Sequence, residues 1–145
     1  MKEYELEVAR AVDLSLFVSQ SEAALFSSRC ERKSRVRAVT NGVDVEYFAP
    51  SDERSSPYGE RRQVVVFTGA MDYWANVDAV RWFVTEVWPR VLAHFGDSLF
   101  YIVGARPTAE VRALVDSTVV VTGRVGDVRP YLQHAAAVVA PMQIA

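Results

Sequence analysis

The segment spanning residues 63–104 constrains the fold of this chain more than any other, because two apolar runs flank one long amphipathic pattern. Residues 64–67 are β-branched or aromatic, which is typical of a strand buried on both faces of a parallel sheet. Apolar side chains then recur every three or four positions in a helix expected over 73–93, which Asp72 is placed to cap. A second apolar run follows at 99–103. Strand, helix and strand predict a βαβ unit with a right-handed crossover.

The same rhythm continues to the end of the chain. We expect a helix over 108–115 opened by Pro107 and Thr108, a strand over 118–122, a helix over 127–134 and a strand over 137–140. Alternating strands and helices predict the α/β class, here a partial Rossmann-like, doubly wound parallel sheet. Ligands of such sheets bind at the carboxyl ends of the strands. The turns expected to contact a ligand therefore contain Gly69, Gly104, Gly123 and Pro141.

The first part of the chain predicts a smaller α/β arrangement. Helices are expected over 2–12 and up to about 28, with short strands over 14–18 and 36–39. Ser19 or Ser21 can cap the second helix, and Ser19 with Glu22 has the spacing of a capping box. The basic stretch 29–37 is interpreted as a solvated turn. The polar segment that follows Phe48 is predicted to be a linker.

Composition excludes several classes of protein. A net charge of −2 gives no electrostatic reason to expect a nucleic-acid partner. The single cysteine, Cys30, excludes an internal disulfide, so a cytoplasmic setting is expected. The charged N-terminus does not resemble a signal peptide, and no apolar run is long enough to span a bilayer. Because a strand pattern ends close to the last residue, we expect a fragment of a longer protein.

Common cofactor motifs are absent. There is neither a P-loop nor a glycine-rich dinucleotide fingerprint after a strand. His94 and His134 lie far apart without a cysteine nearby, so no metal site is predicted and both are expected at the surface or at helix ends. Trp82 and Trp88 are expected to pack in the core or at its rim. Trp74, just beyond the Gly69 turn, is a candidate for contact with a ligand or a partner.

Several motifs carry a resemblance to a known family. They are Val18 to Glu22, Asn41-Gly42-Val43-Asp44 followed by Phe48, Phe67-Thr68-Gly69, Val121 to Val125 with Tyr131 and Leu132, and Val139 to Pro141. In this order they resemble GT-B glycosyltransferases of the family 4 type. The run from Phe67 to Val80 is similar to sugar transferases of exosortase-associated (PEP-CTERM) exopolysaccharide systems.

The resemblance implies a domain organisation. Residues 1–42 would end an N-terminal acceptor domain, 43–62 would be the interdomain linker, and 63–145 would form the first half of the C-terminal donor-binding domain. The full-length protein would be a retaining enzyme that transfers a sugar from a nucleotide-diphospho-sugar to a glycan or lipid-linked acceptor. It would work in the cytoplasm, with a peripheral position at the inner membrane as an alternative. No further cofactor is implied.

The resemblance also implies site residues, although no catalytic residue is assigned. Donor-binding positions would be Gly69, Asn76, Gly104, Arg106, Gly123, Arg124 and Val125. Positions bordering the interdomain cleft would be Asn41, Gly42, Asp44 and Trp74. Relatives carry two basic residues near the diphosphate, whereas Ala70 and approximately Asn76 occupy those positions here. Arg106 is the candidate substitute, and its alternative is a surface residue at a strand end.

Two further expectations follow. The alternative to a transferase is a non-catalytic Rossmann-like module that binds a nucleotide or a partner. The 145 residues alone are expected to lack transfer activity and to associate with themselves through an apolar surface near the N-terminus. The residues expected on that surface are Leu14, Leu16, Phe17, Val18, Val36 and Val39.

Overall fold

The computed structural model describes residues 3–30, 35–59 and 63–143. The chain divides into two compact units between Tyr47 and Phe48. The basic stretch predicted to form a solvated turn falls partly on residues 31–34, which lie outside the described residues.

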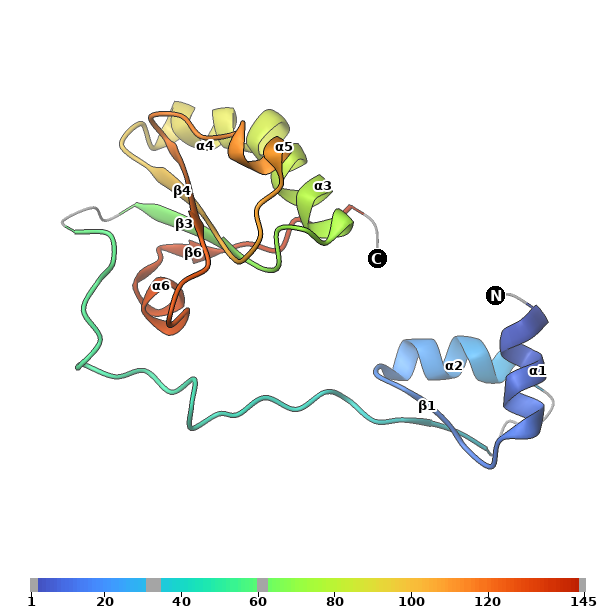
Figure 1. Ribbon diagram of the computed structural model, residues 1–145. Helices are drawn as coiled ribbons and strands as arrows, with labels where there is room; N and C mark the ends of the chain where they lie inside the picture. Colours follow the sequence, from blue (N-terminus) through green and yellow to red (C-terminus); the bar gives the residue numbers. More distant parts are fainter. Residues whose placement is uncertain (1–2, 31–34, 60–62, 144–145) are drawn as a thin grey trace. The chain divides into compact units, whose positions relative to one another are not determined.

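The first unit contains helices α1 (Glu3–Ala11) and α2 (Gln20–Arg29) and strands β1 (Ser15–Phe17) and β2 (Val36–Ala38). The two strands pair in parallel, with Ser15 opposite Val36 (Figure 1). Helices and strands therefore occur where the sequence pattern places them. A small buried cluster joins α1, α2 and β2 through Ala9, Ala23, Phe26, Cys30 and Val36.

The predicted cap of α2 is confirmed. Ser19 occupies the N-cap position in an extended conformation, and its hydroxyl accepts a hydrogen bond from the Glu22 amide at 3.2 Å. The same hydroxyl donates to the Glu22 carboxylate at 2.8 Å. One free N–H group of the first turn is thereby satisfied, which is why the helix begins at Gln20.

The two-stranded sheet of the first unit has one covered and one bare face. Side chains alternate along β1, so Phe17 points toward α2, where its ring lies 4.8 Å from that of Phe26. Val36 is buried on the same side. Phe17 and Val36 were expected on the exposed apolar surface, and that expectation is wrong for both. The remaining four residues of that set are exposed: Leu14, Leu16, Val18 and Val39.

The second unit is built on one parallel sheet with the strand order β5-β4-β3-β6. Its strands are β3 (Val64–Thr68), β4 (Leu99–Val103), β5 (Val119–Gly123) and β6 (Ala137–Val138). The first strand in sequence lies between the second and the last, so the chain reverses its direction of winding between β3 and β6. This is the order expected of a doubly wound, Rossmann-like sheet.

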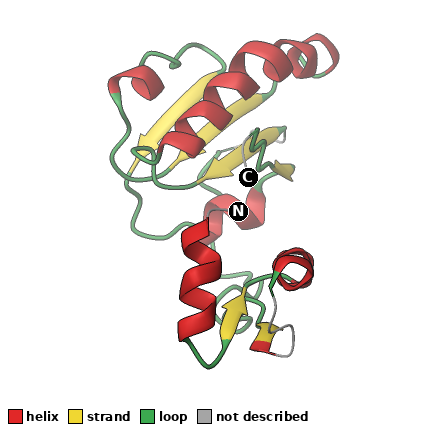
Figure 2. Ribbon diagram, turned by 90° about the vertical axis from the view of Figure 1, so that its right-hand side faces the viewer, coloured by secondary structure: helices red, strands yellow, loops and turns green. Residues whose placement is uncertain are grey.

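The helices of the second unit lie on both faces of its sheet. A long helix, formed by α3 (Trp74–Trp82), a π-helical segment (Phe83–Val87) and α4 (Trp88–His94), covers one face together with the short α5 (Ala109–Arg112). The other face carries α6 (Arg129–His134) (Figures 1 and 2). The fold class predicted from the sequence is confirmed, although α5 and β6 are shorter than expected.

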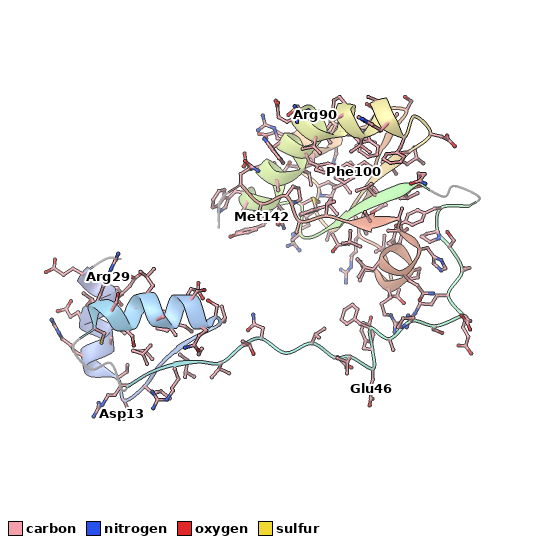
Figure 3. The ribbon with its side chains drawn as sticks, turned by 180° about the vertical axis from the view of Figure 1, so that it is seen from behind. Asp13, Arg29, Glu46, Arg90, Phe100 and Met142 are labelled. Atoms are coloured by element: carbon pink, nitrogen blue, oxygen red, sulfur yellow. The ribbon has the colours of Figure 1, made fainter. Side chains whose placement is uncertain are left out.

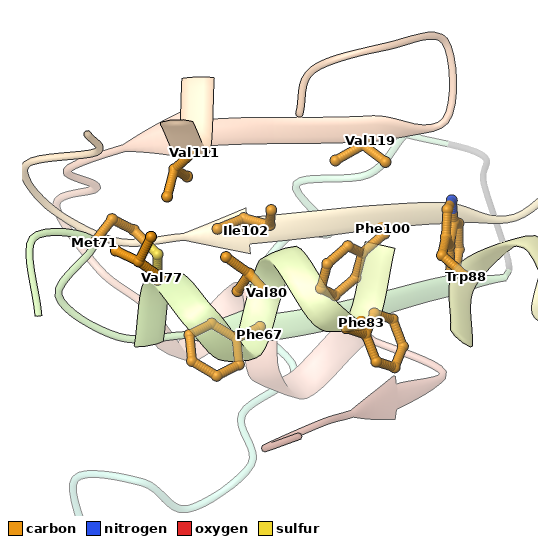
Figure 4. Packing of buried hydrophobic residues seen from close by; sticks show 10 residues of the cluster. All are labelled: Phe67, Met71, Val77, Val80, Phe83, Trp88, Phe100, Ile102, Val111 and Val119. Carbon is orange, nitrogen blue, oxygen red and sulfur yellow. The ribbon is translucent and has the colours of Figure 1, made fainter. Parts of the chain in front are cut away.

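The principal core lies between the long helix and the sheet. Figure 4 shows Val77, Val80 and Phe83 of the helix facing Phe67, Phe100 and Ile102 of the strands. Figure 3 places Phe100 inside this layer and Arg90 on its outer surface. The predicted apolar face of the helix is therefore correct. Trp88 is buried, and Trp82 packs against the same cluster, as the sequence predicts.

The long helix is not regular throughout. Pro89 lacks an N–H group, and its ring would collide with the carbonyl group of Thr85 in an uninterrupted α-helix. The helix widens before it: the Trp88 amide donates to the Phe83 carbonyl, five residues back. The extra residue in this turn brings Phe83 and Trp88 to the same buried side, where Trp88 Nε1 donates to Thr118 Oγ1 at 3.0 Å.

The segment predicted to link two domains over 43–62 is only partly free. From Phe48 it belongs to the second unit and is held against α6. The Gln133 side chain accepts from the Ser51 amide and donates to the Ser51 carbonyl, at 3.1 and 2.8 Å. Tyr58 is buried, and its hydroxyl donates to the Tyr131 carbonyl at 2.6 Å. Residues 48–59 of the segment therefore pack on the sheet unit, whereas residues 43–47 belong to the first unit.

Candidate functional site

The carboxyl ends of β3, β4 and β5 meet at a hollow of about 420 Å³ on the second unit. Three turns line it, one after each strand: residues 68–70, residues 103–106 and the group Arg124, Val125 and Val128. Five of the seven predicted donor-binding residues lie together here: Gly69, Gly104, Arg106, Arg124 and Val125. The rule that ligands bind at the carboxyl ends of parallel strands thus predicts residues that the fold brings together.

The floor of the hollow exists because two backbones cross very closely. A Cβ atom on Gly104 would lie 1.6 Å from the carbonyl oxygen of Gly69. Hydrogen bonds hold the crossing on both sides: the Gly69 amide donates to the Val103 carbonyl at 3.1 Å, and the Met71 amide donates to the Ala105 carbonyl at 2.8 Å. Glycine at position 104 is therefore a steric requirement of the site's geometry.

Gly123 stands at the end of β5 and has a φ of +71°. This left-handed conformation favours glycine, and it turns the chain sharply after the strand. The turn carries Arg124 and Val125 into the lining of the hollow. Gly123 thus determines the shape of this turn, but it is not one of the residues that line the hollow.

Arg124 is an exposed cation at the rim of the hollow. Its side chain makes no hydrogen bond or ion pair with any of the described residues. No carboxylate or imidazole is present among the described residues that line the hollow. The lining therefore offers a positive charge and close backbone turns, which suits an anionic ligand, but no group for acid–base chemistry.

Arg106 does not present a free cation. Its guanidinium forms an ion pair with the Asp72 carboxylate, and its Nη2 donates to Asp72 Oδ1 at 3.1 Å. The hydrogen bond from Arg106 lowers the pKa of Asp72 below its ordinary value. The prediction that Asp72 caps the long helix is wrong: Tyr73 occupies the N-cap position, without a side-chain cap, because the Asp72 carboxylate is engaged by Arg106.

The backbone at Arg106 is itself unusual, with a φ of +53° in a residue other than glycine. A side chain in this region carries a conformational cost of about 1 kcal/mol or more. The ion pair with Asp72 fixes the Arg106 side chain after this turn. Arg106 could reach a ligand only by leaving or sharing that carboxylate.

Asn76 supports the hollow from behind. Its Nδ2 donates to the Ala70 carbonyl at 3.0 Å, and the same amide nitrogen would lie 2.7 Å from a Cβ atom on Gly69. The side chain therefore holds the turn after β3, and Gly69 leaves the room that it occupies. Asn76 does not line the hollow among the described contacts.

The four residues predicted to border a cleft are divided between the two units of the chain. Asn41, Gly42 and Asp44 belong to the first unit, where they are exposed. Asp44 accepts a hydrogen bond from the Tyr47 amide at 2.9 Å and so closes a local turn. Trp74 lies in the second unit and borders a separate hollow.

Five lining residues are not among the site residues predicted from the sequence: Thr68, Ala70, Val103, Ala105 and Val128. Thr68 and Ala105 flank the predicted glycines, so their position at strand ends was a usable signal. Val128 follows Asp127, whose carboxylate binds the side chain and the amide of Arg129. These bonds lower the pKa of Asp127 to about 2 and fix the turn that places Val128.

The described residues contain neither a metal-ligand cluster nor a helix that could span a membrane. Within residues 3–30, 35–59 and 63–143, no three acidic, histidine or cysteine side chains cluster as metal ligands would. His94 and His134 end α4 and α6, as predicted. In the same ranges, no helix has the length and apolar character needed to cross a bilayer.

Comparison with known proteins gives the family. No curated protein matches the chain. Residues 62–144, more than half of the 145-residue chain, match the family described as glycosyl transferases group 1. The match spans the parallel sheet of the second unit and the whole hollow at its strand ends. The chain therefore belongs to the group 1 glycosyl transferases.

Proposed function

We propose that the hollow binds the nucleotide-diphospho-sugar donor of a glycosyltransferase, with the diphosphate beside Arg124 and the Gly69 and Gly104 turns. The observation that carries this proposal is the meeting of three strand ends around one cation without an acidic partner among the described residues. A departing diphosphate develops negative charge, and fixed cations or backbone N–H groups stabilise it. Membership of the family supports the same assignment.

The basic pair that relatives carry near the diphosphate is replaced here. We assign the neutralising role to Arg124, because Arg106 is already paired with Asp72. A bound diphosphate would compete with Asp72 for the Arg106 guanidinium, so Arg106 could supply a second positive charge. Asn76 acts indirectly, through the turn at Ala70. The nucleobase would lie along the turn formed by Gly123, Arg124 and Val125.

The rest of the reaction is proposed by family membership and resemblance. We propose transfer with retention of configuration, to a glycan or lipid-linked acceptor, in exopolysaccharide biosynthesis. Asn41, Gly42, Asp44 and Trp74 would border the cleft that receives the acceptor. The proposed setting is cytoplasmic, with peripheral contact at the inner membrane. The 145 residues alone are proposed to bind nucleotide without transferring sugar.

Titration of the isotopically labelled chain with UDP and with GDP tests the location. We expect amide shifts at residues 68–70, 104–106 and 124–128 for at least one of the two nucleotides. Inorganic phosphate at the same concentration serves as the control for simple anion binding. Shifts confined to residues 1–40, or shifts no larger than those with phosphate, would refute the placement. An assay with several nucleotide sugars and a lipid-linked acceptor tests the expected inactivity, which turnover above a buffer control would contradict.

Self-association is a separate part of the proposal. The bare face of the β1–β2 sheet exposes Leu14, Leu16, Val18 and Val39, each to about half of its surface or more. Burying such side chains contributes roughly 1.5–3 kcal/mol each, enough together to offset much of the 4–15 kcal/mol, on the order of magnitude, that association costs. Light scattering over a concentration series tests this. A strict monomer at high concentration would contradict it.

A further inference from the structure

A second hollow, of about 430 Å³, lies on the helical side of the second unit. Its walls are the first turns of α3, the residues just before it and the start of α5. Trp74, Asp78 and Arg81 follow one another at helical spacing, so one face of α3 presents an aromatic ring, a carboxylate and a guanidinium. Asp72, Thr108 and Glu110 of α5 complete the polar part of the lining.

The aromatic side chain in this hollow is unusually open to solvent. Trp74 is 57% exposed, although Trp82 and Trp88 of the same continuous helix contact the core. Tyr73 beside it is 53% exposed, and the two ring centroids lie 6.0 Å apart. Single exposed apolar residues are ordinary, whereas two adjacent large rings at the rim of a polar hollow form a surface suited to contact.

The polar groups around Trp74 select among ligands. Asp78 has no hydrogen-bond or ion-pair partner among the described residues. Arg81 donates to Glu110 at 3.2 Å, and Asp72 is held by Arg106. Carboxylates outnumber guanidinium groups in the lining, three to one, so a phosphate group is disfavoured here. A ligand with many hydroxyl donors and an apolar C–H face would complement both the carboxylates of the lining and the exposed Trp74 ring.

We propose that this hollow is a saccharide subsite, in which a sugar ring stacks on Trp74 and its hydroxyl groups hydrogen-bond to Asp78 and to the Arg81–Glu110 pair. The inference rests on the proposed transferase function and assigns the side of the enzyme that handles sugar. The two hollows share a wall, because Arg106 lines the first, Asp72 lines the second, and the two residues pair. The sugar could belong to an acceptor glycan or to the donor itself.

Binding measurements on the full 145-residue chain separate these sources. An array of neutral and acidic glycans reports acceptor binding, and titrations with UDP-glucose, GDP-mannose, UDP and GDP report donor binding. Stacking on an aromatic ring contributes about 0.5–1.5 kcal/mol, so Trp74→Ala should weaken saccharide binding roughly 2- to 13-fold. Trp74→Phe should retain most of the affinity. Phe95→Ala is the matched control, since Phe95 is an equally exposed aromatic residue at the end of α4.

Each outcome decides the proposal. Loss of array binding in Trp74→Ala assigns the subsite to an acceptor glycan. Weaker binding of the nucleotide sugars, with UDP and GDP unchanged, assigns it to the sugar of the donor. If no glycan or nucleotide sugar depends on Trp74 more than on Phe95, the saccharide subsite is wrong, even where UDP or GDP still binds at the first hollow. Failure of both free nucleotides to bind would instead count against the proposed donor site.

Discussion

Substitution of Gly104 by alanine should damage the second unit far more than its single methyl group suggests. The new Cβ atom would lie 1.6 Å from the Gly69 oxygen and 2.8 Å from the Gly69 carbonyl carbon. Both are backbone atoms, so no side-chain rotation can relieve the contact. The turns after β3 and β4 must separate by about 1.4 Å, because real Cβ contacts essentially never fall below 3.0 Å.

The cost follows from the hydrogen bonds at this crossing. Separation by that distance breaks the bonds from Gly69 to Val103, at 3.1 Å, and from Met71 to Ala105, at 2.8 Å. It also strains the bond from the Gly104 amide to the Gly123 carbonyl, at 3.2 Å. Each bond contributes about 1 kcal/mol, and a buried group left unpaired costs about 1–3 kcal/mol. We therefore expect a loss of roughly 3 kcal/mol or more.

Urea unfolding followed by tryptophan fluorescence measures this loss in the right part of the chain, because all three tryptophans belong to the second unit. With a denaturant slope of about 1–3 kcal/mol per molar, the midpoint should fall by roughly 1 M or more. Gly126→Ala is the control, since nothing lies within 4 Å of its added Cβ atom. If Gly104→Ala unfolds at the same midpoint as this control, the close crossing does not exist as described.

Three further predictions test other parts of the molecule. Ser19→Ala removes the cap of α2 and should cost about 1 kcal/mol, seen as roughly fivefold faster amide hydrogen exchange within that helix. Tyr58→Phe removes the bond to the Tyr131 carbonyl and should lower the urea midpoint by an amount equivalent to about 1–3 kcal/mol, with no change contradicting the packed position of residues 48–59. The pKa of Asp127 is lowered to about 2 by Arg129, so the pair stabilises the fold above pH 4 and this contribution disappears as the pH falls toward 2. Melting temperatures of Asp127→Asn and the unchanged chain should therefore converge near pH 2, and a constant difference from pH 6 to pH 2 would refute this linkage.

Local pattern was sufficient to predict most of the elements. The apolar runs at 64–67 and 99–103, with the helical spacing between them, predict the βαβ unit that the structure contains. Ser19 with Glu22 predicts a helix start correctly, because both partners of the cap lie within four residues. The glycines at strand ends predict the position of the hollow, because the carboxyl ends of parallel strands meet at one edge of the sheet.

Contacts between residues far apart in the sequence could not be predicted from local pattern. Asp72 has the position of a helix cap, yet Arg106, 34 residues away, takes its carboxylate. The segment 48–59 has the composition of a linker, but Gln133 and Tyr131 of α6 hold it to the sheet. One signal was present in this case, because Tyr58 is a large aromatic residue within an otherwise polar stretch. The π-helical segment could also have been suspected from Pro89 inside the helical pattern.

Calorimetric titration of the nucleotide that binds best tests the central claim, which is that Arg124 at the strand-end hollow receives the diphosphate. A charge-assisted hydrogen bond contributes about 1.5–3 kcal/mol, so Arg124→Gln should weaken binding roughly 10- to 150-fold. Arg90→Gln serves as the control, because Arg90 lies on α4 (Figure 3). This helix connects to the first residue of β4, whereas the hollow lies at the carboxyl ends of the strands. Equal affinities for the two variants would contradict the account, whereas a selective loss in Arg124→Gln is the result that it predicts.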